Sequence, residues 1–500
     1  MIRRTRWLWS AGVAAAVLAL GGVISLHYLP ARAATTSNSP YTQPTWWAKY
    51  QVVSAPGFAP AAPGHNKSVS VGANVDVSNE SGPQSETSIA INPSNPSALV
   101  AGSNEIFRLP MRGYFSADGG ANWGAVDLPL PPGITTNGTD FGSDPGVAWD
   151  TRGNVYYSYI VVFFNRTFSS IQGTEMAVAR SSDGGQTWTP TYFAQQNGTA
   201  RFNDKPMIAV DTNPASPFRD TVYVAWDTAS SGSSSTHDVI QVSHSSDGGQ
   251  TFSAPVAVSD IHAGQRGVIG ADPFVGPDGT LFVAWNDIVA NTIAEASSPD
   301  GGVTFGPTHT VAQKQAAFDV GIPAMSTRRA LVYPACGADA STGTNRGTLY
   351  CSWMDVTASN GTDIFVARSH DAGATWSAQM RVNDDPTGVA NDQFNQWLAV
   401  DSATGAVNLS WNDTRNDPTH LSTDIFYTRS IDGGQTFTSN VQVTSAPTNE
   451  SCCGADLGNQ YGDYEGIAAL NGVVHPVWTD RRASVTALDE EVFTATLTTK

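Results

Sequence analysis

The chain has 500 residues and carries 44 acidic against 26 basic residues, which gives a net charge of −18 at pH 7. Such an acidic protein repels nucleic acid and anionic membrane surfaces, so both are excluded as partners. The charge also disfavours an anionic ligand unless arginines gather locally to bind it.

The first 33 residues predict an export signal. Three arginines stand among the first six residues, residues 7–29 are mostly apolar, and residues 31–33 form an A-x-A cleavage site. Cleavage removes four arginines and no acids, so the remaining chain has a net charge of −22. The apolar stretch approaches the ~20 residues that span a bilayer, and an uncleaved anchor is the alternative. We expect a secreted monomer with no membrane contact after cleavage.

Residues 34–67 are rich in Pro, Ala, Ser and Thr and are predicted to be a spacer before the folded part, residues 68–500. Four cysteines in an exported protein indicate disulfides. Cys336 and Cys351 flank a predicted connection between strands and are expected to pair. Cys452 and Cys453 are adjacent, so they form a vicinal disulfide or reach separate partners. No cysteine or histidine spacing suggests zinc.

One eight-residue segment occurs six times in the folded part. The copies are SADGGANW (116–123), SSDGGQTW (181–188), SSDGGQTF (245–252), SPDGGVTF (298–305), SHDAGATW (369–376) and SIDGGQTF (430–437). A β-prone strand precedes the segment, its glycines supply positive φ for a turn, and its aspartate can accept hydrogen bonds from its own loop. We therefore interpret the six aspartates as structural. A repeat of this kind predicts a radial β-architecture.

The S-x-D-G-G-x-T-W/F segment resembles the Asp box, or BNR repeat, of the sialidase superfamily of β-propellers. The resemblance covers about residues 68–500 and implies an all-β propeller of four-stranded antiparallel blades. It implies less about activity, because the same box occurs in sialidases, xyloglucan hydrolases, sorting receptors and photosystem assembly factors.

Two further segments recur in phase with the box. The predicted inner strands are ETSIAIN (86–92), DPGVAWD (144–150), KPMIAVD (205–211), DPFVGPD (272–278), RALVYPA (329–335), QWLAVD (396–401) and YEGIAAL (464–470). The second strands usually end in Trp and Asp, as in TVYVAWD (221–227). Seven copies predict seven blades, whereas sialidases have six, which is the alternative count. The last blade lacks an outer strand, and we expect VSVGANVDVSN (69–79) to supply it and close the ring between the termini.

The antiparallel order within a blade divides the loops between two faces. The boxes lie on one face, together with the loops from the first to the second strands. The other face, the channel mouth, receives a ring of carboxylates that we interpret mainly as structural acceptors. These are Glu86, Asp144, Asp204, Asp227, Asp272, Asp287, Asp319, Asp355, Asp392, Asp413, Asp463 and Asp480. Residues that break the repeat are better candidates for function.

Such residues gather at the mouth beside the last two blades. QYGDYEG (460–466) supplies the candidate catalytic residues Tyr461, Asp463 and Glu465. The candidate substrate-binding residues are Arg415, Arg481 and Arg482, with Asp413 and Asp480. Further departures from the repeat, on the third and fourth blades, are Arg201, Lys205, His262 and Arg266.

Three hypotheses follow. The first is a sialidase-like, exo-acting glycoside hydrolase in which arginines clamp a carboxylate and a tyrosine beside a glutamate is the nucleophile. The F/Y-R-I-P motif of sialidases has only a displaced counterpart at residues 107–110, so the first arginine of the triad is unplaced. The second is a glycoside hydrolase that uses two carboxylates on a neutral sugar.

The third hypothesis is a non-catalytic module that binds glycan or protein. No cofactor is expected for any of the three. The Asp-rich stretch at Asn383, Asp384 and Asp385 is a candidate for Ca²⁺.

Overall fold

The computed structural model describes residues 69–106, 108, 110–131, 139–164, 171–197, 202–228, 238–261, 267–357, 361–482 and 488–499. Within them the regular structure is β, and the strands β1–β30 form seven four-stranded antiparallel sheets and one hairpin. The predicted export signal and spacer, and also Arg201, His262 and Arg266, lie outside the described residues. In the described part, no helix is long and apolar enough to cross a membrane.

The first three blades follow the chain without crossovers. Blade 1 consists of β2 (Gln84–Ile91), β3 (Leu99–Glu105), β4 (Arg112–Ser116) and β5 (Gly124–Asp127). Blade 2 consists of β6 (Thr139–Trp149), β7 (Val155–Phe164), β8 (Ile171–Ser181) and β9 (Thr189–Asn197). Blade 3 consists of β10 (Asn203–Val210), β11 (Val222–Thr228), β12 (Val239–Ser245) and β13 (Val256–Ala257). In each blade the strands pair in chain order.

The next three blades repeat this order. Blade 4 consists of β14 (Val268–Val275), β15 (Leu281–Asp287), β16 (Thr292–Ser298) and β17 (His309–Gln313). Blade 5 consists of β20 (Ala335–Ala338), β21 (Leu349–Val356), β22 (Thr362–Ser369) and β23 (Met380–Arg381). Blade 6 consists of β24 (Gln393–Val400), β25 (Val407–Asp413), β26 (Asp424–Ser430) and β27 (Val441–Gln442).

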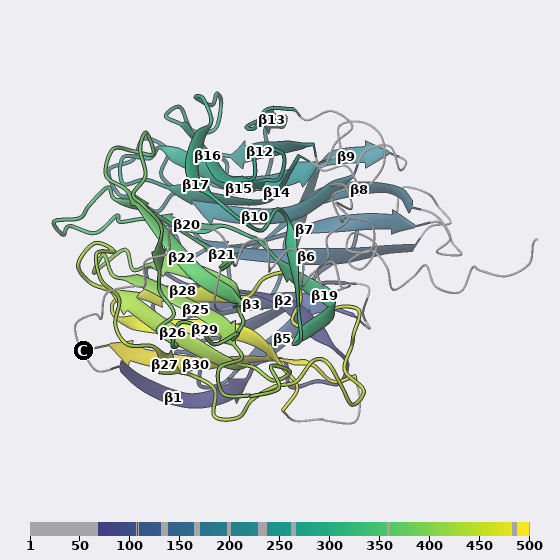
Figure 1. Cartoon of the computed structure of the whole chain (residues 1–500). Helices are drawn as coiled ribbons and strands as arrows, with labels where there is room; N and C mark the ends of the chain where they lie inside the picture. Colours follow the sequence, from purple (N-terminus) through teal and green to yellow (C-terminus); the bar gives the residue numbers. More distant parts are fainter. Residues whose placement is uncertain are drawn as a thin grey trace, which may run out of the picture.

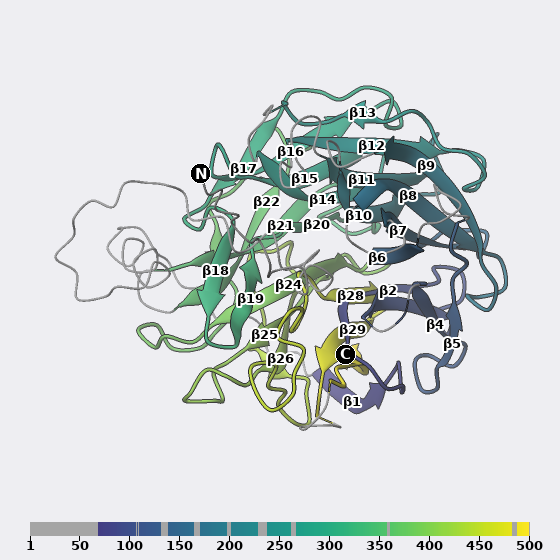
Figure 2. The same ribbon diagram turned by 90° about the vertical axis from the view of Figure 1, so that its right-hand side faces the viewer.

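Blade 7 joins the two ends of the described chain. It consists of β28 (Gly466–Leu470), β29 (Val473–Asp480) and β30 (Glu491–Thr499), and its outer strand is β1 (Val69–Asp76). Val69 pairs with Thr499 and Asp76 with Phe493. The seven blades and the closing strand predicted from the repeats are thus confirmed, and the alternative of six blades is wrong. Figure 2 shows the blades following one another round the ring, with purple β1 beside the yellow C-terminal blade.

The blades pack face to face through equivalent side chains. Five second strands contribute a fully buried tryptophan, at Trp226, Trp285, Trp353, Trp411 and Trp478. An aromatic side chain of this size removes roughly 150–250 Å² from water. Because each blade packs only on its neighbours, the repeated tryptophan stabilises every junction in the same way.

One predicted inner strand is displaced. RALVYPA (329–335) was expected to open blade 5, but β19 (Met325–Leu331) pairs instead with β18 (Asp319–Ile322) in a separate hairpin. Pro334 has no backbone N–H and cannot continue a ladder. The inner strand of blade 5 starts after it, at β20, where Cys336 lies opposite Cys351 and forms the expected disulfide. The hairpin strand β19 contacts β24, the inner strand of blade 6, and Figure 1 shows β19 near the labels of β2 and β6.

The six boxes are turns between third and fourth strands, on the face predicted for them. In the second copy, the Asp183 carboxylate accepts hydrogen bonds from the amides of Gln186 (3.0 Å) and Thr187 (2.9 Å). Ser181 Oγ donates to the same carboxylate at 2.7 Å. Both glycines of this box have positive φ. The boxes therefore satisfy their own polar groups locally, as turn chemistry requires.

Candidate functional site

The inner strands of five blades carry a β-bulge at the same place. The register shifts lie between Ser85 and Ser88, Ser143 and Gly146, Asp204 and Met207, Ile269 and Asp272, and Phe394 and Trp397. The first bulged residue has positive φ in every case, namely Glu86 (54°), Asp144 (60°), Lys205 (53°), Gly270 (72°) and Asn395 (49°). For residues other than glycine this conformation costs about 1–3 kcal/mol, and it persists where packing enforces it, often at functional sites.

Three of these bulged residues meet in an axial cluster, which consists of Glu86, Asp144, Lys205, Arg328 and Asp463. The ammonium of Lys205 lies 3.1 Å from Asp144 and 3.4 Å from Glu86, and it also contacts Asp463. Nη2 of Arg328 lies 3.0 Å from Glu86 and 2.6 Å from Asp463. These residues come from blades 1, 2 and 3, the loop before blade 7 and the β18–β19 hairpin, so the cluster occupies the centre of the ring.

Neutral side chains hold the cluster in place. Asn104 donates a hydrogen bond to Glu86, and its Oδ1 accepts one from the amide of Asp144 at 2.8 Å. Gln460 Oε1 accepts from the amides of Thr327 (3.2 Å) and Arg328 (2.9 Å). The hairpin and the loop that carries Asp463 therefore reach the axis as one hydrogen-bonded unit.

The cluster contains three carboxyl groups and two cations, all at most 5% exposed. Burial raises the pKa of Glu86 well above its ordinary value, and the neighbouring Asp144 and Asp463 raise it further against the pull of Lys205. Burial also acts to raise the pKa of Asp463, but Arg328 and Lys205 overcome it and hold that pKa well below the ordinary value. Two carboxyl groups of one cluster thus have opposite shifts.

The other two candidate catalytic residues lie beside the cluster. Tyr461 is fully buried, its ring lies 5.2 Å from that of Phe394, and its hydroxyl donates to the carbonyl of Thr448 at 3.4 Å. Burial and the nearby Glu450 raise the pKa of Tyr461 well above its ordinary value, so its hydroxyl stays protonated.

Glu465 is also buried and has its partners within the protein. Its carboxyl accepts hydrogen bonds from Asn412 Nδ2 at 2.7 Å and from the amide of Thr479 at 3.1 Å. Burial raises the pKa of Glu465 well above its ordinary value. The residue therefore joins blades 6 and 7 next to the axis.

Two of the candidate arginines occupy equivalent positions in neighbouring blades. Arg415 Nη2 lies 2.7 Å from Asp413 and its guanidinium stacks 4.2 Å from the ring centre of Phe426. The same arrangement recurs in blade 7, where Arg482 lies 2.5 Å from Asp480 and 4.9 Å from the ring centre of Phe493. The W-x-D-x-R pattern at 411–415 and 478–482 is therefore itself a repeat, and each arginine neutralises the aspartate of its own blade.

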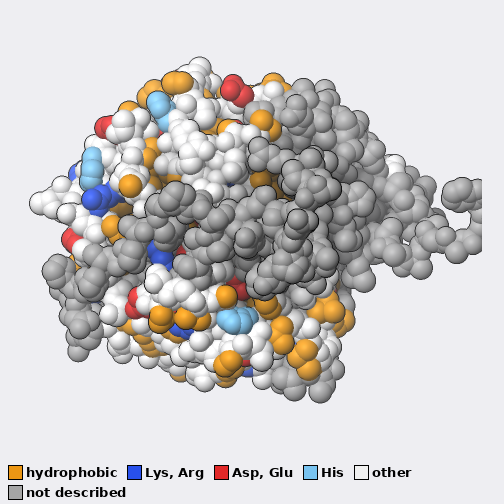
Figure 3. Space-filling model, in the orientation of Figure 1, with side chains coloured by type: hydrophobic (Ala, Val, Ile, Leu, Met, Phe, Trp, Pro, Cys, Tyr) orange, Lys and Arg blue, Asp and Glu red, His pale blue; other side chains and the backbone are white. Residues whose placement is uncertain are grey.

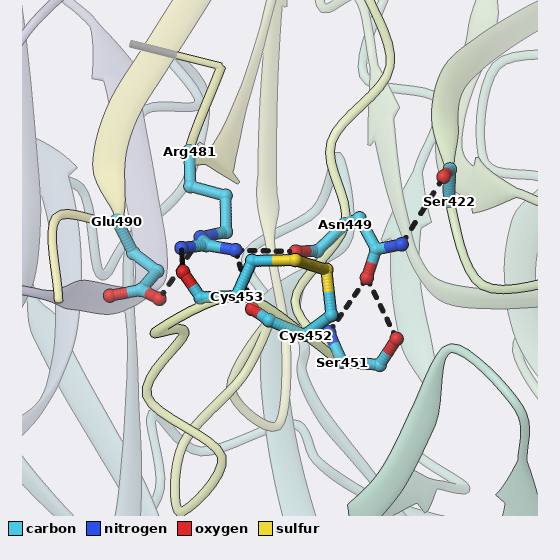
Figure 4. The surroundings of a disulfide bond; sticks show 7 residues. All are labelled: Ser422, Asn449, Ser451, Cys452, Cys453, Arg481 and Glu490. Carbon is cyan, nitrogen blue, oxygen red and sulfur yellow. Dashed lines mark hydrogen bonds and ion pairs between the residues drawn. A yellow bond between two sulfur atoms is a disulfide. The ribbon is translucent and has the colours of Figure 1, made fainter. Parts of the chain in front are cut away.

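Arg481 braces a loop that contains the adjacent cysteines. Cys452 and Cys453 form a vicinal disulfide, and Arg481 Nη1 donates to the carbonyls of Cys452 (2.7 Å) and Asn449 (3.0 Å). Figure 4 shows its guanidinium between this loop and Glu490, whose carboxyl lies 3.5 Å from Nε. The structure does not bring Arg415, Arg481 and Arg482 together into one clamp, because each has separate partners.

The Asp-rich stretch proposed for Ca²⁺ is committed to ion pairs. Asp385 lies 2.6 Å from Arg381, and Asp384 lies 2.7 Å from Arg415. Asn383 donates to Asp363 at 2.6 Å. Among the described residues, no group of three or more His, Cys, Asp and Glu is arranged to hold a metal ion.

Sequence reasoning found most of the cluster but missed Arg328. Glu86, Asp144 and Lys205 begin consecutive inner-strand repeats, and a lysine where two neighbours have acids is a signal of charge pairing. Arg328 had no such signal because it belongs to the hairpin that was taken for an inner strand. The net negative charge of the chain does not form one patch on the face in Figure 3, where acidic and basic side chains are scattered among hydrophobic ones.

No protein-family model matches the chain, and no curated protein matches it. Among solved structures, it is similar to the intramolecular trans-sialidase from Ruminococcus gnavus, with 13% identity and a TM-score of 0.46 over 72% of this chain and 96% of that one. It is similar to the NanB sialidase from Streptococcus pneumoniae, with 10% identity and a TM-score of 0.46 over 72% and 68% of the two chains. A polysaccharide lyase, an ulvan lyase, has 11% identity and a TM-score of 0.46 over 84% and 95%.

Proposed function

We propose that the protein is a secreted, sialidase-like propeller that acts on glycans, and that it hydrolyses a neutral glycoside with the carboxyl groups of Glu86 and Asp463. The observation that carries this proposal is that the carboxyl groups of Glu86 and Asp463 meet at Nη2 of Arg328 in one buried cluster, where their pKa values shift in opposite directions. Glycoside hydrolysis needs one protonated and one ionised carboxyl group, and an environment that separates two pKa values supplies both.

Each carboxyl group has a defined role in this proposal. Glu86 stays protonated and donates its proton to the oxygen of the leaving group. Asp463 stays ionised beside Lys205 and Arg328 and attacks or stabilises the anomeric carbon. The cations keep Asp463 charged while the strained bulges hold Glu86 and Lys205 in position.

The spacing of the two carboxyl groups favours retention of the anomeric configuration. Oxygens of Glu86 and Asp463 lie 3.0 and 2.6 Å from the same Nη2 of Arg328, so their separation cannot exceed the sum of these distances. That limit allows the ~5–5.5 Å of retaining enzymes and falls below the ~6.5 Å at which inverting geometries begin. Asp463 then acts as the nucleophile and displaces the leaving group, which takes the proton of Glu86. The ionised Glu86 next accepts a proton from the water that releases the sugar from Asp463.

The charges favour a neutral sugar over a sialoside. With Glu86 protonated, the axial cluster has two carboxylates for two cations, so neither cation is left over to bind a substrate carboxylate. Arg415 and Arg482 are each neutralised by an aspartate of their own blade. An anionic sugar would have to displace these internal partners.

Secretion is part of the proposal. It is supported by the signal-like first 33 residues and by the two disulfides, which persist in oxidising compartments.

A second candidate is a non-catalytic module that binds a protein partner at the mouth. Six of the eight exposed large hydrophobic side chains in the described part lie in loops of this face: Ile261, Val289, Val389, Leu421, Leu457 and Leu488. Exposed apolar side chains on one face are typical of interaction surfaces when they are contiguous.

Turnover of chromogenic glycosides separates these functions. The purified chain is assayed on a panel of neutral glycosides and on an α-sialoside, beside the variants Glu86→Gln, Asp463→Asn and Tyr461→Phe. We expect cleavage of a neutral glycoside that Asp463→Asn lowers about 10²-fold or more, that Glu86→Gln lowers as much when the leaving group is poor, and that Tyr461→Phe leaves in place.

Two other outcomes would overturn the assignment. Sialoside cleavage that Tyr461→Phe abolishes would support the tyrosine-based reaction. No cleavage of any glycoside by a folded protein would leave the binding module.

A further inference from the structure

A cavity of about 520 Å³ opens between blades 4 and 5, on the face that carries the boxes. Its walls are residues 276–278 of blade 4, residues 344–349 of blade 5, and residues 370–372 in the box of blade 5. This volume lies within the ~300–1,000 Å³ of small-molecule sites. The cavity lies at the opposite end of the ring from the loops that form the mouth.

The cavity lies beside a short connection of blade 4. The loops from first to second strand in blades 3 and 5 reach over the next box, where Phe218 packs on Gly301 and Asn345 packs on Gly433. In blade 4 this connection is only residues 276–280, between β14 and β15. The corresponding position in the box of blade 5 is Ala372, which lines the cavity and is exposed.

The box beside the cavity departs from the repeat. Ala372 replaces a glycine that the other five boxes keep, although it retains a positive φ of 55°. An alanine in this conformation is strained where a glycine would not be. The neighbouring His370 is exposed and also lines the cavity. The box that lines the cavity is thus the one that departs from the repeat at this glycine.

A buried acid lies behind this box. In blades 3, 4 and 6, the second glycine of the box packs against a tyrosine ring of the preceding blade (Tyr156, Tyr223 or Tyr350), whereas Gly373 of blade 5 packs against the carboxyl of Glu295. Both oxygens of Glu295 lack a hydrogen-bond partner among the described residues. Burial raises the pKa of Glu295 to about 8. A carboxyl group with no internal partner is costly to bury. Glu295 lies behind the cavity wall and is not one of the residues that line the cavity.

The lining combines polar residues, among them Asp278 and Asp371, with the apolar Phe282. Asp278 is exposed and accepts one hydrogen bond, from the amide of Thr280 at 3.0 Å, so most of its acceptor capacity is available. Phe282 is a buried wall. Arg346 donates to the carbonyls of Ser341 (2.8 Å) and Pro277 (3.2 Å), which braces the two blades against each other.

We propose that this cavity binds an amino sugar unit of a glycan, with its ammonium group on the Asp278 side and its ring over Phe282. Asp278 and Asp371 line the cavity and attract the ammonium, while Thr344 offers a hydroxyl to the sugar. The buried, unpartnered Glu295 acts on the ammonium from behind the cavity wall. The site is separate from the axial cluster, so it does not depend on the proposed hydrolysis. It would hold a glycan chain on the protein whether or not the chain is cleaved.

Calorimetric titration of the purified protein at pH 7 tests this site. The titrants are a glucosamine trimer, an N-acetylglucosamine trimer, cellotriose and trilysine. We expect the glucosamine trimer to bind best, and Asp278→Asn to weaken it at least about tenfold because a hydrogen bond to a charged group is lost. Thr344→Trp fills the cavity and should abolish binding, whereas Asp260→Asn, an exposed acid on the other face, should change nothing.

Proton release gives a second readout. An ammonium bound nearby favours the ionised form of Glu295, so binding should release protons, and Glu295→Gln should remove that release. Equal affinity for the glucosamine trimer in wild type, Asp278→Asn and Thr344→Trp would overturn the proposal. Equal binding of cellotriose, preferential binding of trilysine, or no binding of the glucosamine trimer would overturn it as well.

Discussion

The acids at the axis and the acids in the boxes are the same residue types in opposite settings. In the boxes, hydrogen bonds from the side chain four residues on and from nearby amides hold the pKa at about 2 in Asp118, Asp300 and Asp371. At the axis, burial raises the pKa of Glu86 and Asp144 instead. In each box, the turn itself donates hydrogen bonds to the aspartate. The carboxyl groups of the axial cluster depend instead on cations that distant parts of the chain supply.

This difference shows how to read a repeat. A residue that every copy keeps is satisfied within its copy, and it serves the fold. Lys205 stands where neighbouring repeats have acids, and Ala372 stands where the other boxes have glycine. Lys205 lies in the axial cluster, and Ala372 lines the cavity beside blade 5. Arg415 and Arg482, by contrast, form a repeat shared by two blades and have a structural role.

Removal of the axial ammonium should have the largest effect on stability. Lys205→Met leaves three buried carboxyl groups to Arg328 alone, and breaking a buried ion network costs about 3–5 kcal/mol. Urea unfolding followed by tryptophan fluorescence measures this loss. The control is Arg152→Met, which removes a surface ion pair with Asp220 and should cost at most about 1 kcal/mol. Equal losses in both variants would contradict the importance of the cluster.

The two disulfides should differ in the same assay. Cys336 and Cys351 have a sequence separation of 15, so their disulfide closes a loop in the unfolded chain. This restriction contributes about 3 kcal/mol to the free energy of unfolding. Cys452 and Cys453 are adjacent and close no such loop. Paired serine substitutions should therefore destabilise the protein much more at 336 and 351 than at 452 and 453. The reverse order would show that the vicinal pair stabilises the native loop directly.

Glu295 should make stability fall as the pH rises. Its folded pKa of about 8 lies above the ordinary value of 4.5, so the folded protein keeps a proton that the unfolded chain releases. Stability is complete below the ordinary pKa and declines toward pH 8, by about 1.4 kcal/mol for each pH unit between the two values. Glu295→Gln should flatten this decline in urea unfolding at pH 6, 7 and 8. Parallel curves for the two proteins would contradict the assignment.

A single box aspartate should have the smallest effect. Asp183→Ala removes hydrogen bonds within an exposed turn, where water replaces them, and should cost about 1 kcal/mol. Thermal melting measures the change, with Gln186→Ala as the control because Gln186 contributes its side chain only to the turn carbonyl. A loss as large as that of Lys205→Met would mean that the boxes hold the ring together.

The repeats predicted the architecture because each blade encodes its own strands and turn. The closing strand β1 was also predictable, since the last repeat lacks an outer strand. The β18–β19 hairpin was not, because RALVYPA has the alternation of an inner strand and only its pairing reveals its place. Arg328 was missed with it. Asp463 and Lys205 were both singled out by sequence, but their contact was not predicted, because it joins residues 258 positions apart.

The most direct test of the axial site varies the leaving group of the neutral glycoside that the protein cleaves. A general acid matters for a poor leaving group and little for a good one, whereas a nucleophile matters for both. We predict that Glu86→Gln loses kcat/KM for the alkyl glycoside but keeps kcat/KM for the dinitrophenyl glycoside, and that Asp463→Asn loses both. Equal loss on both substrates in Glu86→Gln, or full activity in Asp463→Asn, would contradict the account.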